Sequence, residues 1–313
     1  MTQRGRILLT GSRGQVGWEL ARSLATLGEV VALDSSRLDL TDAAAIRRMV
    51  AEIKPRIIVN PAAHTAVDKA ESEPDLAHAI NATAPGILAE EAEKLGALLV
   101  HYSTDYVFDG SGNTARLEDE ATGPLNVYGA TKLAGEQAIQ AACQRHLIFR
   151  TSWVYGARGA NFLLTMRRLM RERPELKIVA DQIGAPTWCR SLAEATAQVL
   201  AQVEAPNRGA DKPQPWGVYH MTNAGETSWH GFAQAILDFD APETPSRLLP
   251  IPSSDYPTPA RRPLNSRLNN DKLERVFGVR LPDWREALRL CMDSGVVSAS
   301  ALTNPASPSC GDK

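Results

Sequence analysis

The sequence predicts an α/β fold in which helices flank a doubly wound parallel sheet, and three observations support this prediction. First, short runs of Val, Ile and Leu alternate with helix-like patterns through the first half of the chain. Second, these runs lack the polar alternation of a half-exposed strand, which indicates burial on both faces. Third, a glycine-rich turn follows the first run and precedes an amphipathic segment. Repeated strand–helix units of this kind form a parallel sheet through right-handed crossovers.

The expected elements follow in chain order. In the first half, strands are expected at 7–10, 30–33, 57–60, 98–103 and 147–151, and helices at 18–27, 41–53, 73–95 and 128–142. Pro55 and the Thr41-Asp42 pair are typical of a helix end and a helix start. Beyond residue 157, helices are expected at 161–173, 191–203, 229–237, 271–277 and 284–290, and strands at 177–180 and 218–221. The segments 204–215 and 248–262 contain prolines and are expected to be irregular.

The bulk composition excludes several classes of protein. The 313 residues carry a formal net charge of −2, which gives no reason to expect a nucleic acid or a membrane surface as partner. The sequence has no apolar run near the length of a membrane span, and no secretory signal is expected at its start. The four cysteines are scattered without a Cys-x-x-Cys pair, which fits a reducing cytoplasm.

A turn with three glycines lies between the first expected strand and the first expected helix. Gly11, Gly14 and Gly17 follow a Gly-x-x-Gly-x-x-Gly spacing, with Gln15 and Val16 between the last two. Glycine allows a positive φ in a tight turn, and a bare backbone lets a pyrophosphate approach the N-terminus of the following helix. This context predicts a Rossmann-type, dinucleotide-binding domain.

The cofactor preference stays open at this stage. Asp34 ends the second expected strand, where an acidic residue meets the adenosine ribose of NADH. Arg13 in the turn and the segment 35–37 after the strand instead suit the 2′-phosphate of NADPH. The sequence therefore predicts NADPH or NADH.

Tyr128 and Lys132 are four residues apart in an expected helix, so their side chains lie on one face, one turn apart. A nearby ammonium favours the phenolate and lowers the pKa of a tyrosine, whose phenol then protonates a ketone oxygen as hydride arrives. This spacing alone occurs by chance, but with the glycine turn it indicates a carbonyl reductase. Thr104 ends an expected strand at the ligand-binding edge of the sheet, and its hydroxyl is expected to bond the substrate oxygen. A cap at the strand end is the alternative.

The glycine turn, the Tyr128–Lys132 pair and the added C-terminal part resemble the extended short-chain dehydrogenases/reductases. Within that superfamily, the segments 60–71, 103–110, 150–156 and 181–187 resemble dTDP-4-dehydrorhamnose reductases. The similarity extends from about residue 6 to about residue 290. It implies the NAD(P)H-dependent reduction of the C4 ketone of dTDP-4-dehydro-β-L-rhamnose to dTDP-β-L-rhamnose, the last step of dTDP-rhamnose synthesis for cell-surface polysaccharide.

The resemblance also implies roles for individual residues. The catalytic residues would be Tyr128, Lys132 and Thr104. The cofactor would contact Gly11, Arg13, Gly14, Gln15, Val16, Gly17, Asp39, Leu40, Ala62, Ala63, His64, Thr65, Tyr102, Tyr128 and Lys132. The dTDP-sugar would contact Thr104, Asp105, Tyr128, Trp153, Asn161, Thr187 and Arg262.

Some of these roles have alternatives. Asp39 also fits a helix N-cap region, Asp105 a turn cap, and Trp153 a core position instead of a platform for the sugar. His64 is expected to act through its backbone, because no acid near it in the sequence pairs with its ring. Either Arg262 or Arg261 would clamp the diphosphate.

The resemblance further implies two parts. We expect a dinucleotide-binding domain mainly from residues 1–156 and a smaller substrate-binding lobe mainly from residues 157–296, with room for interleaving between them. The small, polar segment 297–313 is expected to be a disordered tail.

A metal is not predicted. Some family members hold Mg²⁺ between subunits through carboxylates; Glu19 matches one such ligand, but Arg190 stands where a second carboxylate is expected. The chain is therefore expected to be a monomer or a homodimer, with no structural metal at a dimer interface.

Two other functions are weighed. An NDP-sugar epimerase or dehydratase would share the Tyr-x-x-x-Lys pair, but a dehydratase needs an acid pair beside the threonine, and Tyr106 follows Asp105 here. A non-enzymatic NADP-binding regulatory subunit, as in a relative that partners a methionine adenosyltransferase, would keep the glycine turn and lose the catalytic residues. Thr104, Tyr128 and Lys132 are all present.

Overall fold

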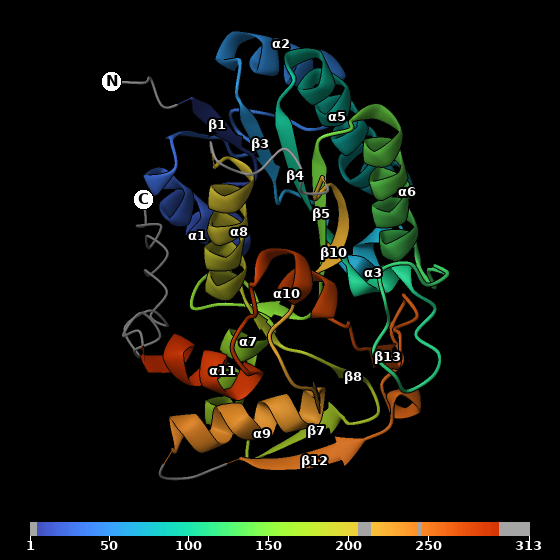
Figure 1. The fold of residues 1–313 in the computed structure, drawn as a ribbon. Coiled ribbons are helices and arrows are strands. Elements are labelled where there is room, and N and C mark those ends of the chain that lie inside the picture. The colour runs from blue at the N-terminus through green and yellow to red at the C-terminus, as the bar shows by residue number, and fades with distance from the viewer. Residues whose placement is uncertain (1–4, 206–213, 243–245, 294–313) are drawn as a thin grey trace, which may run out of the picture.

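The computed structural model describes residues 5–205, 214–242 and 246–293. Its centre is a 6-stranded parallel sheet in the order β10-β5-β4-β3-β1-β2 (Figure 1). The strands are β1 (Arg6–Leu9), β2 (Glu29–Ala32), β3 (Ile57–Asn60), β4 (Leu98–Thr104), β5 (His146–Thr151) and β10 (Gly217–His220). The predicted doubly wound parallel sheet is confirmed.

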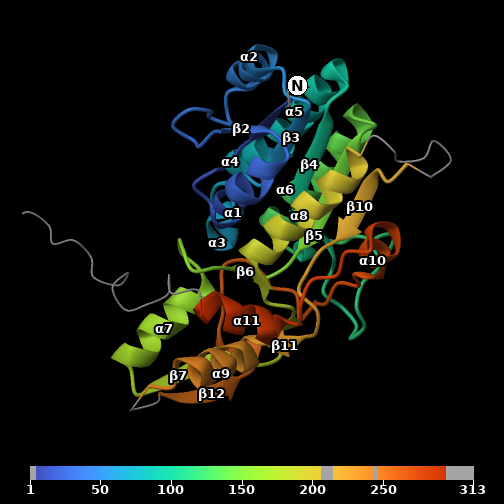
Figure 2. The ribbon, with the colours of Figure 1, turned by 60° about the vertical axis from the view of Figure 1, so that its left-hand side comes forward.

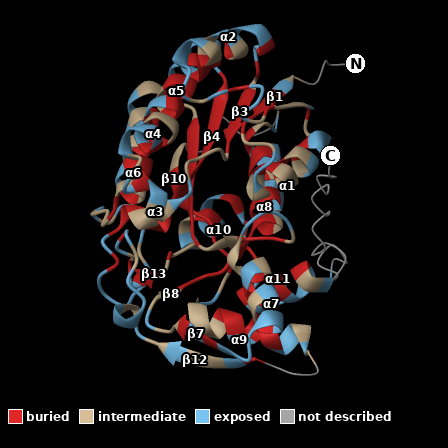
Figure 3. Ribbon diagram, turned by 180° about the vertical axis from the view of Figure 1, so that it is seen from behind, coloured by how far each residue is buried: buried red, intermediate tan, exposed pale blue. Residues whose placement is uncertain are grey.

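Helices cover both faces of this sheet. α1 (Gln15–Ser23) and α8 (Cys189–Val203) pack on one face, and α2 (Ala43–Ile53), α5 (Ala84–Leu95) and α6 (Val127–Ala142) pack on the other (Figure 2). Leu9 faces the first layer and Leu8 the second. Because both faces are covered, the central strands β3, β4 and β5 are buried along their lengths, which explains their largely apolar sequences, whereas β2 at the edge is only partly buried (Figure 3).

A second core lies beyond the carboxyl ends of the strands. It is formed by α7 (Phe162–Glu172), α9 (Trp229–Asp240), α11 (Trp284–Asp293) and the parallel pair of β7 (Glu175–Val179) and β12 (Arg247–Ile251). Phe232 packs between Tyr155 and Trp284 at its centre. Short strands and one helix connect the two cores: β6 (Val154–Tyr155), β8 (Ile183–Gly184), β9 (Thr187–Trp188), β11 (Thr227–Ser228), β13 (Asn265–Ser266) and α10 (Asp271–Phe277).

The chain passes between the two cores more than once. α8 and β10 follow residue 157 in sequence, yet they join the layers of the central sheet. The boundaries at residues 156 and 296 stay predictions, and the predicted tail at 297–313 lies outside the described residues. None of the helices in the described ranges is both long and apolar enough to cross a membrane.

Several expected elements have different bounds in the structure. The first helix starts at Gln15, directly after the glycine turn, and ends in a 3-10 turn at Leu24–Thr26. Asp42 caps α2, which begins one residue later. The prediction of an irregular 248–262 is wrong at its start, because β12 pairs there with β7 despite Pro250, and Leu248 packs against the second core.

The single helix expected at 73–95 also differs. It is divided into α4 (Pro74–His78), a π-helical segment η2 (Ala79–Thr83) and α5, and a short α3 (Val67–Ala70) precedes it. The π segment turns the amide of Asn81 toward the loop after β3, where it bonds both the N–H and the carbonyl of His64. A Cβ at Gly135 would lie 2.1 Å from the Asn81 carbonyl oxygen, so α6 approaches this segment closely.

Candidate functional site

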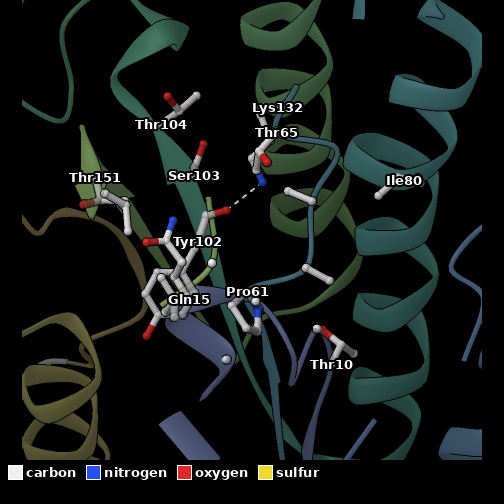
Figure 4. A pocket seen from close by; sticks show the side chains of 18 of the residues that line it. Thr10, Gln15, Pro61, Thr65, Ile80, Tyr102, Ser103, Thr104, Lys132 and Thr151 are labelled. Atoms are coloured by element: carbon white, nitrogen blue, oxygen red, sulfur yellow. Dashed lines mark hydrogen bonds between the residues drawn. The ribbon is translucent and has the colours of Figure 1, made fainter. Parts of the chain in front are cut away.

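A cavity of about 830 Å³ lies at the carboxyl ends of the central strands. Thr10 after β1, Pro61 after β3, Thr104 of β4 and Thr151 of β5 line it, and Figure 4 shows their side chains around a common space. Parallel strands bring their carboxyl ends to one edge, and ligands bind there where the strand order reverses. Here the reversal occurs beside β1: the chain places β2 on one side of β1 and then returns to place β3 on the other side.

The glycine turn forms one wall of the cavity. Gly11 has a φ of 56°, and its carbonyl accepts the N–H of Gly14 at 2.9 Å. A Cβ at Gly17 would lie 2.1 Å from the Gly11 carbonyl oxygen, so the tight turn requires glycine at this position. Gly14 is the N-cap of α1 and has no side chain to cap the first turn, which suits an anion at this helix end.

The part of the cavity that lies beyond β2 carries two carboxylates. Nε of Arg13 lies 2.7 Å from Oδ2 of Asp34. A hydrogen bond from the Ser36 hydroxyl, with smaller contributions from its N–H and from Arg13, lowers the pKa of Asp34. Asp39 also lines the cavity and accepts the N–H and hydroxyl of Thr41. The alternative of an N-cap belongs to Asp42, whose carboxylate accepts from Ala45.

The three expected catalytic side chains line the same cavity. Asn126 caps α6 by accepting from Gly129, and this places Tyr128 and Lys132 in the first two turns. Thr104 accepts the Tyr106 N–H and donates to Asp105 at 3.0 Å. Its hydroxyl therefore also caps the end of β4, which was the alternative role considered for it.

Burial dominates the electrostatics of this trio. Desolvation raises the pKa of Tyr128 to about 12, although a hydrogen bond with Thr104 lowers it. Desolvation lowers the pKa of Lys132 to about 7, with the Glu136 charge opposing. The expectation that Lys132 lowers the pKa of Tyr128 is not met in this structure, because the ammonium instead donates to the Tyr102 carbonyl at 2.6 Å (Figure 4).

Asp105 is a buried carboxyl beside these groups. It is 3% exposed and lines the cavity next to Thr104. Burial raises its pKa to about 7, while hydrogen bonds from Ser266 and Thr104 lower it. Its turn is capped by Thr104, so Asp105 does not serve as the cap. Near neutral pH this carboxyl can therefore donate as well as accept a hydrogen bond.

Two stacked tryptophans close the cavity on the side of the second core. The rings of Trp153 and Trp229 lie 3.7 Å apart at an interplanar angle of 12°, and both residues line the cavity. Trp153 is half-buried and has a φ of 47°. This positive φ turns the main chain away from the direction of β5, which ends at Thr151. Trp229 was not predicted from the sequence. It starts α9 in a distant part of the chain, and no local pattern links it to Trp153.

Most residues expected to hold the cofactor line the cavity, but His64 does not. Ala62, Ala63 and Thr65 line it on either side. The N–H and the carbonyl of His64 bond the Asn81 amide, which holds this loop to η2, and a backbone contact with the cofactor stays a prediction. The expectation that no acid pairs with its ring is wrong, because the Glu73 carboxylate lies 3.2 Å from Nε2.

Three expected substrate contacts lie outside the cavity lining among the described residues. Thr187 has 0% exposure and donates to the Ala185 carbonyl, so the structure gives it a structural role. Asn161 caps α7 and donates to Gln15, which ties this helix to the glycine turn. Nη2 of Arg262 lies 2.8 Å from the Asp68 carboxylate, so this nitrogen would have to leave Asp68 to contact a diphosphate. Tyr102 lines the cavity, with its hydroxyl bonded to Thr196.

Glu19 and Arg190, considered above for a metal, form an ion pair. Nε of Arg190 lies 3.3 Å from the Glu19 carboxylate within the same chain. In the described ranges there is no group of three or more His, Cys, Asp or Glu side chains placed to hold a metal ion. The absence of a structural metal stays a prediction.

Comparisons with known proteins agree on one family. The family model described as RmlD substrate binding domain matches residues 5–296. A dTDP-4-dehydrorhamnose reductase of Burkholderia thailandensis is 53% identical over 293 residues, covering 92% of this chain and 98% of that protein. A dTDP-4-dehydrorhamnose reductase of Escherichia coli strain K12 is 48% identical, covering 90% and 95%. The crystal structure of dTDP-4-dehydrorhamnose reductase from Bacillus anthracis in complex with NADP has a TM-score of 0.85 at 35% identity, covering 93% of this chain and 99% of that one.

Proposed function

Because the chain belongs to the RmlD substrate binding domain family of dTDP-4-dehydrorhamnose reductases, we propose that it reduces the C4 ketone of dTDP-4-dehydro-β-L-rhamnose with NADPH or NADH. The product is dTDP-β-L-rhamnose. The observation that carries this proposal is that Thr104, Tyr128 and Lys132 line one cavity with the glycine turn. This is the set of groups that a ketone reduction needs.

In this proposal the cavity holds the cofactor and the sugar side by side. The turn from Gly11 to Gly17 and the start of α1 would hold the pyrophosphate, with the adenosine near Asp34 and Asp39. The cofactor supplies a hydride at its nicotinamide carbon. Tyr128 is protonated at neutral pH, since its pKa is about 12, and is therefore ready to give its proton to the C4 oxygen. The Thr104 hydroxyl would bond the same oxygen and stabilise the charge that develops there.

The platform formed by Trp153 and Trp229 is proposed to hold the sugar. A flat aromatic face packs well against the apolar face of a deoxy sugar. Asp105, which is buried between Thr104 and Tyr106, would bond a sugar hydroxyl. Arg262 is proposed to contact the diphosphate after leaving Asp68, because a guanidinium binds phosphate oxygens in pairs.

The alternative functions are not favoured. The relatives compared above, which match nearly the whole chain, are reductases and not epimerases or dehydratases. A regulatory subunit would not require an intact proton donor and lysine beside the glycine turn. We place the activity in the cytoplasm, where buried thiols such as those of Cys143 and Cys189 stay reduced. A monomer or a homodimer remains the expectation for its assembly.

A direct assay tests the proposed function. The purified chain should oxidise NADPH or NADH only when the 4-keto sugar nucleotide is present, with one cofactor consumed for each sugar reduced. The keto sugar is generated in place by the preceding dehydratase and epimerase activities, and the product is identified by mass spectrometry. Tight cofactor binding without any turnover would overturn the proposal and favour a non-enzymatic, NADP-binding regulatory subunit.

The choice between the two cofactors is expected to depend on Asp34. Its carboxylate is ionised at neutral pH and would repel a 2′-phosphate, while Arg13 would attract one. Asp34→Asn removes the charge at the same size, and we expect the ratio of kcat/KM for NADPH to that for NADH to rise by about tenfold, on the scale of one charged hydrogen bond. Steady-state rates with each cofactor measure this ratio.

Arg13→Gln is the matched opposite change and should lower the same ratio. Equal NADPH-to-NADH ratios of kcat/KM in the wild type and both variants would show that Asp34 and Arg13 do not distinguish a 2′-phosphate from a 2′-hydroxyl.

A further inference from the structure

A buried chain of four hydrogen-bonded side chains runs from Lys132 across the sheet. Nζ of Lys132 lies 3.0 Å from Nε2 of His101, and Nδ1 of His101 lies 3.1 Å from Nδ2 of Asn60. The Thr10 hydroxyl donates to Oδ1 of Asn60 at 2.5 Å. Each of the four residues is at most 2% exposed. The chain joins α6 to the ends of β3 and β1 through the middle of β4, and the proposed reaction assigns no role to His101 or Asn60.

The direction of these hydrogen bonds depends on the charge of Lys132. Where Asn60 donates from Nδ2 to Nδ1, a neutral His101 ring carries its proton on Nε2. That N–H points at Nζ of Lys132 and needs a lone pair there, which only the uncharged amine has. A charged ammonium has three donors and no acceptor, so it requires Nε2 as an acceptor instead.

The amide of Asn60 can serve both directions. When Lys132 is charged, the proton of His101 lies on Nδ1 and is donated to the amide oxygen of Asn60. A half turn of the amide exchanges its oxygen and nitrogen, and the nitrogen then donates to the Thr10 hydroxyl, which also works as donor or acceptor. Every member thus keeps a partner in both charge states of Lys132, which matters because a buried polar group without a partner is costly.

The ionisation of the chain fits this behaviour. Burial, with a further contribution from Lys132, holds the pKa of His101 well below its usual range, so the ring stays neutral at working pH. Burial brings the pKa of Lys132 to about 7, so both of its charge states are populated there. The other titratable groups around the lysine are Glu136 and Tyr128 on α6, with Arg150 of β5 paired to Glu136 and Asp105 of η3 (Asp105–Val107) acting on Tyr128.

We propose that His101 is a positioning residue that anchors Lys132 through the Asn60–Thr10 chain and provides it with a hydrogen-bond partner in both of its charge states. The inference rests on the proposed function, because it concerns the lysine of that reaction. In the reaction, His101 would keep Nζ in place as Lys132 changes its charge.

Two substitutions of similar size separate the contacts of His101. In His101→Asn the amide lies near the position of Nδ1, so it keeps Asn60 but does not reach Lys132. In His101→Gln the longer amide reaches the position of Nε2 and keeps a donor and an acceptor for the lysine. The titration of Lys132 is followed by NMR of isotope-labelled lysine side chains, with Lys132→Met assigning the signal, and the pH dependence of kcat/KM is measured beside it.

We expect His101→Asn to lower the pKa of Lys132 by about one unit, because the hydrogen bond that His101 accepts from the ammonium is charge-assisted and therefore stronger than the one it donates to the uncharged amine. The fall in kcat/KM on the basic side of the profile should move to lower pH by the same amount. His101→Gln should titrate as the wild type does. The NMR titration needs no turnover, so a failure of this inference is distinguished from a failure of the proposed function.

His146→Gln is the matched control. His146 is also buried, but it lies at the start of β5, where Nδ1 approaches the Cys143 carbonyl. It should leave the Lys132 titration unchanged. A folded His101→Asn variant with an unshifted Lys132, or an equal shift in His146→Gln, would overturn the proposal. If His101→Asn does not fold, His101→Gln decides: a shift of about one unit there overturns it, and an unshifted Lys132 supports it.

Discussion

Tyr128→Phe is expected to lower kcat by roughly 100- to 10,000-fold, the usual contribution of a positioned general acid. The substitution removes one hydroxyl and keeps the buried ring, which packs edge-on against Tyr106 at 5.6 Å. Thr104 should not replace the lost donor, because in the proposed reaction its hydroxyl bonds the C4 oxygen but keeps its own proton. Affinity for the cofactor should stay within about twofold, because the pyrophosphate binds at the glycine turn. Steady-state kinetics and cofactor titration by fluorescence measure the two effects.

Tyr106→Phe is the control for this variant, since it makes the same change on a neighbouring ring of the same cavity. We expect it to retain most of the activity, with a loss of less than about tenfold, the scale of one hydrogen bond. Activity of Tyr128→Phe within a factor of ten of the wild type would remove Tyr128 from the role of proton donor. Loss of cofactor binding in the same variant would show that the Tyr128 hydroxyl helps to hold the cofactor, so that the fall in kcat would not measure proton transfer alone.

Glu136→Leu is expected to destabilise the fold by about 3–5 kcal/mol, the range for breaking a buried ion pair by removing one partner. The Glu136 carboxylate accepts from Nε and Nη2 of Arg150, and the two side chains are 1% and 5% exposed. Without the carboxylate, a guanidinium would stay buried next to Phe108, and within the described ranges the Glu118 carbonyl is the acceptor that would remain for it. Chemical unfolding curves at neutral pH measure the loss.

Glu172→Gln provides the surface comparison. Glu172 pairs with Arg168 one turn away, and both side chains are 51% exposed. Such exposed pairs contribute at most about 0.5 kcal/mol. The double variant Glu136→Leu with Arg150→Met should recover part of the loss, because no unpaired charge is then buried. Equal stabilities for Glu136→Leu and Glu172→Gln would show that the buried pair contributes nothing beyond a surface pair.

Local patterns in the sequence predicted the central sheet and its glycine turn. Apolar runs without alternation indicated strands covered on both faces, and amphipathic segments between them indicated the helices. The spacing of Gly11, Gly14 and Gly17 is a property of one turn, and the spacing of Tyr128 and Lys132 is a property of one helix. Such features depend on neighbouring residues only, so they can be found without a tertiary structure.

Features that join distant segments were not predicted. Trp229 stacks on Trp153 across many residues of sequence, and β12 exists because β7 offers a partner on the second core. The ion pair of Arg262 with Asp68 joins residues 194 positions apart. A sequence pattern carries no information on such pairs, because each side chain alone is compatible with many partners.

The sequence alone predicts the fold class, the glycine turn and the groups proposed for catalysis, because these follow from short-range spacing and residue chemistry. The packing of the tertiary structure sets how those groups ionise and what holds them. Burial in α6 raises the pKa of Tyr128 and lowers that of Lys132, the reverse of what an exposed Tyr–Lys pair suggests for the tyrosine. The physical reason is desolvation, which depends on every layer packed around a charge and not on the residues beside it in the chain.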